Sequence, residues 1–145
     1  LPQEAFFFHC LLLLERFMLW MLQRRRVSLN LKNVLFDLLR PFGITNNYTG
    51  CSQLIRAIEI VLEKPDGIQA VHKQIYAVIA KEYDLQPRSV ESNIRTLSDI
   101  AWKNDPARLV QIAGYPLDNR SSAVLFIEIF SNYIQRNYLE ERILT

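Results

Sequence analysis

Polar and charged side chains cluster between Gln86 and Lys103, where the sequence reads QPRSVESNIRTLSDIAWK. Guanidinium, carboxylate, amide and hydroxyl groups are the groups that hydrogen-bond to base edges and phosphates of duplex DNA. The same groups also occur on the solvated face of an ordinary surface helix. The candidate DNA-binding residues in this segment and beside it are Arg88, Ser89, Glu91, Ser92, Asn93, Arg95, Thr96, Lys103 and Lys73.

A helix is expected to carry this cluster. The apolar residues of the segment recur three and four positions apart, at Val90, Ile94, Leu97 and Ala101. This spacing predicts a helix from residue 87 to about residue 103 with one buried face. Positions 88, 91, 92, 95, 96 and 99 then lie on the opposite face. We expect its N-terminal half to meet base edges, as recognition helices do.

The preceding segment, Ile68 to Tyr83, is predicted to be a second helix. Its inward residues are expected to be Val71, Ile75, Val78 and Ile79. Lys73 on this helix, Lys103 and the backbone amides near Ile68 are the groups expected to contact phosphates.

The junction between these two helices has the spacing of a helix-turn-helix. Ala80 is small, so a second helix can cross closely over it, and Asp84 lies where the chain must turn sharply. Asp tolerates left-handed backbone better than most residues do. Pro87 fits the first turn of the next helix, and Val90 is the apolar residue that locks it.

The remaining segments predict further helices and no strands. One is expected to begin at Ser28 as its N-cap and to end at Gly43, and another to run from Cys51 to Leu62. A short helix is expected in NDPARLVQIAGYP, closed by Gly114, and a last one from about residue 121 to 141. The sequence therefore predicts an all-α, multi-helix bundle.

The N-terminal segment is apolar almost all round from Ala5 to Leu22, apart from His9, Glu15 and Arg16. A charged pair at mid-depth disfavours a membrane span, and the arginines at 24–26 follow the apolar tract, whereas a signal peptide places them before it. A remnant of a truncated neighbouring domain is a further reading. We expect a packing or dimerisation helix over 1–27 and a separate domain over 28–145, in a cytoplasmic protein without membrane association.

Composition excludes several functional classes. The net charge is +2, but residues 1–43 hold six basic against three acidic residues and residues 44–145 hold eleven against twelve. DNA contact must therefore come from a local patch, since a domain-wide positive field is absent. Neither the two cysteines, Cys10 and Cys51, nor the two histidines have ligand-spaced neighbours. We expect no enzyme, no metal, no cofactor and no small-molecule substrate.

From Leu31 to the last helix the chain resembles the C-terminal DNA-binding domain of the sporulation response regulator, stage zero sporulation protein A. The resemblance is carried by Gly43, LIRAIEIV at 54–61, IAKEYDL at 79–85, VESNIR at 90–95, AW at 101–102 and GY at 114–115. It implies a bacterial helix-turn-helix effector domain in which Glu91 and Arg95 occupy positions of the DNA interface. At Ser92 this family usually has Arg. The residues before Leu31 are too few to hold the receiver domain of this family.

The sequence thus predicts a sequence-specific, DNA-binding transcriptional regulator of sporulation type. Its recognition helix, about residues 88–103, is expected to enter the major groove of duplex DNA. A homodimer formed through the N-terminal helix is expected as well. The alternatives are a helical protein–protein interaction module that kept the fold and lost DNA binding and, less favoured, a membrane-tethered regulator.

Overall fold

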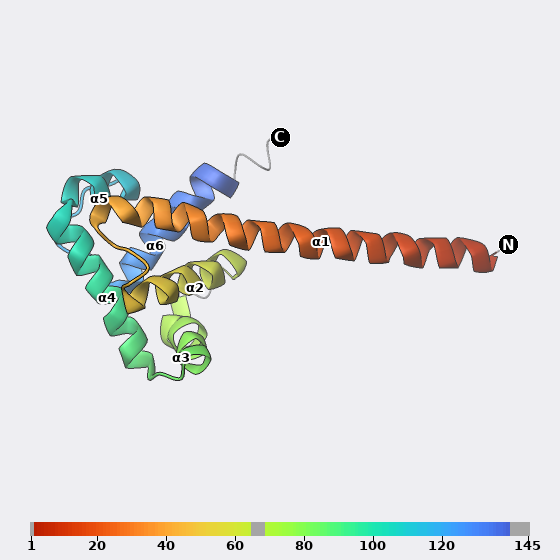
Figure 1. The fold of residues 1–145 in the computed structure, drawn as a ribbon, viewed down its shortest axis with the longest axis horizontal. Coiled ribbons are helices and arrows are strands. Elements are labelled where there is room, and N and C mark those ends of the chain that lie inside the picture. Colours follow the sequence, from red (N-terminus) through yellow and green to blue (C-terminus); the bar gives the residue numbers. More distant parts are fainter. Residues whose placement is uncertain (1, 65–68, 140–145) are drawn as a thin grey trace. The chain divides into compact units, whose positions relative to one another are not determined.

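A computed structural model describes residues 2–64 and 69–139, and every regular element in these two ranges is a helix (Figure 1). The predicted all-α class is confirmed. The chain forms two compact units, residues 1–34 and 35–145. The elements are α1 (Pro2–Leu39), η1 (Arg40–Phe42), α2 (Thr49–Glu63), η3 (His72–Tyr76), α3 (Ala77–Tyr83), α4 (Pro87–Asn104), α5 (Pro106–Ala113), α6 (Ala123–Ile134) and η4 (Gln135–Leu139).

The helix α1 continues without a break through Ser28, so the prediction of a separate helix beginning at that residue is wrong. Residues 23–30 contain neither Gly nor Pro, and nothing therefore interrupts the helical hydrogen bonding there. A distinct apolar helix over 1–27 is accordingly not supported, and the domain boundary after residue 27 stays a prediction. Within the described residues, no helix combines the length and the hydropathy needed to cross a membrane.

The core of the second unit is built by α2, α4 and α6, which pack on one another. Each contributes apolar residues three or four positions apart, the spacing that places side chains on one helix face. Fully buried examples are Leu54, Ile58, Ile94, Phe126 and Phe130. The rings of Phe126 and Phe130 meet edge to face with centroids 4.9 Å apart, a favoured aromatic geometry.

A buried pair of hydroxyl groups joins α4 to the loop before α6. The Ser98 hydroxyl donates to the Ser121 carbonyl over 2.7 Å, and the two Oγ atoms lie 2.8 Å apart. The neighbouring Ser122 caps α6, because its Oγ accepts the Leu125 backbone N–H at 3.2 Å. The start of α6 is therefore fixed to the inner side of α4.

The backbones of α2 and α4 approach each other closely at Gly50. A Cβ atom at this position would lie 2.5 Å from the Asn93 carbonyl oxygen, closer than such atoms come in proteins. Beside this contact, the Asn93 Nδ2 donates to the buried Gln53 Oε1 over 3.1 Å. These two contacts at the start of α2 therefore fix the position of Asn93, in the middle of α4, relative to α2.

We predict that Gly50→Ala destabilises the protein, although Gly to Ala in a helix ordinarily stabilises it by about 0.5 to 1 kcal/mol. The added methyl group forces the two backbones apart, and overpacking of this kind costs roughly 1 to 3 kcal/mol. Urea unfolding measures the effect, and the exposed Ser52→Ala on the same helix serves as the control. A rise in the free energy of unfolding of Gly50→Ala would contradict the close approach.

Candidate nucleic-acid interface

The helices α3 and α4 meet at a tight corner formed by residues 84–86. Asp84 adopts left-handed backbone with φ 54° and ψ 50°, which confirms the sharp turn predicted there. The backbone N–H groups of Asp84 and Leu85 both donate to the Ala80 carbonyl, the second over 2.8 Å. Ala80 itself is only 3% exposed, as its small size predicted. The direction in which α4 leaves the corner is thereby fixed.

One residue expected on the buried face of α3 is exposed. Val78 is 38% exposed, and Tyr76 and Ala80 are buried in its place. The preceding turn, η3, is π-helical, and the inward face of this segment is centred on Tyr76 and Ile79. Val78 then falls on the far side of the helix. The amides near Ile68, expected to meet phosphate, lie outside the described residues.

An ion pair attaches α3 to α2. The Arg56 Nε and Nη2 atoms lie 2.9 to 3.1 Å from the Glu82 carboxylate, and Arg56 Nη1 lies 3.3 Å from Glu59 Oε2. Hydrogen bonding to Glu82 raises the pKa of Arg56 above its usual value. The fork-like geometry adds directional restraint to α3.

The polar residues of α4 do not all share one face. Val90, Ile94, Leu97 and Ala101 are buried, as expected, and the opposite side carries exposed Arg88, Arg95, Thr96 and Lys103 with half-buried Ser89, Glu91 and Ser92. Asn93 is separate from this group, because its amide is bonded to Gln53 of α2. Lys73 is exposed on η3, the helical turn before α3. We call the side bearing Arg88, Ser92, Arg95, Thr96 and Lys103 the outer face of α4.

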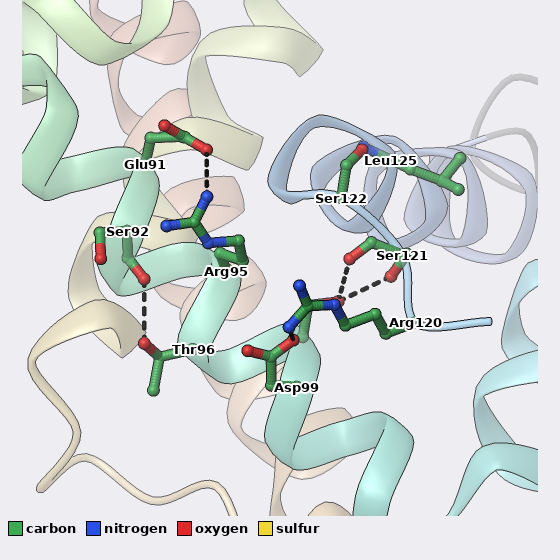
Figure 2. Close-up of polar contacts among 10 residues, drawn as sticks. Glu91, Ser92, Arg95, Thr96, Asp99, Arg120, Ser121, Ser122 and Leu125 are labelled. Atoms are coloured by element: carbon green, nitrogen blue, oxygen red, sulfur yellow. Dashed lines mark hydrogen bonds and ion pairs between the residues drawn. The ribbon is translucent and has the colours of Figure 1, made fainter.

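Two polar groups of the outer face are bonded within the helix itself, as Figure 2 shows. Arg95 Nη1 lies 3.2 Å from Glu91 Oε1, and the Thr96 hydroxyl donates to the Ser92 carbonyl over 2.9 Å. An exposed i,i+4 ion pair contributes only about 0.3 to 0.5 kcal/mol. Arg95 therefore leaves Glu91 at little cost when a base or phosphate replaces the carboxylate.

Three further cations lie on α4 and on η3. Among the residues that the structure describes, Arg88, Lys73 and Lys103 take part in no ion pair. Their charges are available to an anionic partner without exchange of a carboxylate. In the same ranges, no group of three or more His, Cys, Asp or Glu side chains is placed to hold a metal ion.

A further cation next to α4 was missed by sequence reasoning. Arg120, from the loop before α6, places Nη1 3.0 Å from Asp99 Oδ1 (Figure 2). The two residues are 21 positions apart, and no local pattern indicates their pairing. Only the packing of that loop on α4 brings them together.

Tyr76 lies buried near the Glu91–Arg95 pair. Burial raises the pKa of the Tyr76 phenol to about 12, with a further rise from the Glu91 carboxylate and an opposing effect of Arg95. The side chain is 1% exposed, and the low polarity of its surroundings disfavours the phenolate.

A helical core, a tight corner and a cation-bearing helix face are together typical of compact helical DNA-binding domains. The family model described as the sporulation initiation factor Spo0A C terminal matches residues 35–134. The chain therefore belongs to this family, as the resemblance read from its sequence indicated. Domains of this family are DNA-binding effector domains that act in the regulation of transcription in sporulation, and they bind duplex DNA.

We predict that the protein loses stability above about pH 10, the usual pKa of tyrosine. The folded state favours the neutral Tyr76 phenol, so its contribution is complete below that pH and disappears as the pH rises toward about 12. The two-unit difference corresponds to roughly 2 to 3 kcal/mol. Unfolding at several alkaline pH values measures it, with Tyr76→Phe expected to flatten the profile and the exposed Tyr83→Phe expected to leave it unchanged. Identical profiles for both variants would contradict this prediction.

Proposed function

We propose that the chain is a sequence-specific transcriptional regulator that places α4 in the major groove as the second helix of a helix-turn-helix. The supporting observation is the outer face of α4, whose polar side chains are held at a fixed angle by the Asp84 corner. Membership of a DNA-binding family supports duplex DNA as the partner. In this proposal the N-terminal half of α4 meets base edges, as it does in recognition helices.

The candidate residues differ in the contacts that their side chains can make. Arg88, Glu91 and Arg95 belong to the base-reading group, because each carries a group able to hydrogen-bond in the major groove. Ser89, Ser92 and Thr96 have shorter side chains, which suit additional contacts where the helix comes closest to the DNA. Lys73 on η3 and Lys103 in the last turn of α4 suit phosphate binding, since both are exposed. Asn93 acts indirectly, by joining α4 to Gln53.

Pairing of two chains would compensate for this modest set of base contacts. Ser92 offers one short hydroxyl where its family usually has Arg, and Arg95 has Glu91 as a competing partner. We therefore propose a homodimer formed through α1, whose described residues 8–22 include many exposed large apolar side chains. These are Phe8, Leu11, Leu12, Leu13, Leu14, Phe17, Met18, Leu19, Trp20, Met21 and Leu22. An apolar surface of this extent usually marks a site for a partner.

The alternative is a protein–protein interaction module without DNA binding, and the charges of the same residues are the evidence for it. Arg95 and Arg120 each lie against a carboxylate, and residues 44–145 carry one more acidic than basic residue. Both ion pairs are exposed, and pairs of this kind are weak. We favour DNA binding because a phosphate can readily replace the carboxylate in either pair. In addition, three further cations among the described residues take part in no ion pair.

We predict that Arg95→Ala weakens binding to a DNA site selected from random sequence by roughly 1 to 3 kcal/mol and relaxes its sequence preference. Fluorescence anisotropy with the selected and a scrambled duplex measures both effects. Arg136→Ala, which removes the same charge from η4, serves as the control. Equal affinities of Arg95→Ala and the parent for the selected site would remove Arg95 from the interface. Absence of binding by the parent itself would favour the interaction module.

We also predict that the protein is a dimer at micromolar concentration and that Leu14→Glu together with Met18→Glu makes it monomeric. The carboxylates would have to be buried in the paired surface, which is strongly unfavourable. Light scattering measures the mass, and Asn33→Glu, at an exposed position of α1 beyond the apolar tract, is the control. A parent chain that is monomeric at high micromolar concentration would exclude pairing through α1.

A further inference from the structure

We propose that Arg120 is a phosphate-binding residue of the DNA interface and that Asp99 positions its side chain. The proposal rests on the DNA-binding function proposed above and adds a residue from outside α3 and α4. The loop before α6 would thereby become a third part of the interface.

The backbone next to Arg120 is fixed on α4. Ser121, the following residue, is 2% exposed, and both its carbonyl and its hydroxyl are bonded to the Ser98 hydroxyl. The Arg120 side chain, in contrast, is 62% exposed and extends to Asp99, the residue after Ser98 (Figure 2). Two consecutive residues of α4 therefore hold the loop. The Ser98 hydroxyl bonds to the carbonyl and hydroxyl of Ser121, and the Asp99 carboxylate bonds to the Arg120 guanidinium.

The position of Asp99 places Arg120 beside the outer face of α4. Asp99 follows Arg95 by four residues and precedes Lys103 by four, so the three lie along one side of the helix. At 1.5 Å per residue, Asp99 is about 10 Å further along the axis than Ser92. In major-groove docking the first turns of the helix meet bases, and later turns lie nearer the backbone of the duplex. The Arg120 guanidinium is thus placed where phosphates are expected.

The chemistry of the pair suits exchange with a phosphate. Arg120 meets Asp99 through one nitrogen, Nη1. A guanidinium can form two parallel hydrogen bonds with a phosphate, so the same side chain also fits the DNA backbone. Arg120 has a second effect, because it neutralises Asp99. Without Arg120, the exposed Asp99 carboxylate would face the phosphates and repel them.

The test measures binding of the full chain to a labelled selected duplex and to a scrambled duplex across a salt series. We expect Arg120→Ala to weaken binding to both duplexes by a similar factor, roughly three- to tenfold, and to lower the salt slope by about one. Arg120→Lys should retain most of the slope, because it keeps the charge. Adding Asp99→Asn to Arg120→Ala should recover part of the affinity, since the repelling carboxylate is gone. Arg136→Ala is the charge-matched control.

The outcomes separate this proposal from the function on which it rests. If the parent binds and Arg120→Ala matches Arg136→Ala in affinity and salt slope, Arg120 is not in the interface, whereas the proposed function stands. A changed preference between the two duplexes would also overturn the assignment, because a phosphate contact carries no sequence information. Absence of DNA binding by the parent would overturn both proposals. Thermal melting checks folding, and Arg120→Gln replaces the Ala variant if that variant melts at lower temperature.

Discussion

The packing of the inner face of α4 against α2, α5 and α6 determines where every side chain of its outer face lies. Side chains of one helix keep fixed angular relations, so α4 cannot rotate to move Arg95 without exposing Val90, Ile94 and Leu97. Full exposure of each such side chain costs about 1.5 to 3 kcal/mol. The outer face of α4 is therefore a rigid surface, although most of its own hydrogen bonds are weak and exposed.

Contacts at two positions along α4, Asn93 and Ser98, add to this packing. The absent side chain of Gly50 lets the α2 and α4 backbones touch at Asn93, and the Ser98–Ser121 hydroxyl pair fixes the later turns of α4 to the loop before α6. Each contact is buried, where an unpaired polar group or a lost fit is expensive. The first half of α4, with the proposed base-reading residues, and its later turns, with Asp99 and Lys103, are therefore supported by separate contacts.

The sequence predicted α4 closely, because its buried stripe, Pro87 and the Asp84 corner are all local signals. It failed at Ser28, where a residue suited to capping lies inside a helix that no neighbour interrupts. It failed at Val78 because Tyr76, an amphipathic residue, took the inward position. The Arg120–Asp99 pair was beyond local reasoning, since it depends on how a loop closes on a helix 21 residues away.

The internal pairing of Arg95 and Arg120 bears on how quickly such a protein would search a chromosome. On random DNA, a phosphate would replace Glu91 as the partner of Arg95, or Asp99 as the partner of Arg120. Because one anion takes the place of another, each such contact adds little to the time that the protein stays bound. Arg88, Lys73 and Lys103 would supply the remaining, salt-sensitive attraction. If α4 reads DNA as proposed, we expect short dwell times at non-target sequences, because two of the five interface cations, Arg95 and Arg120, already have carboxylate partners.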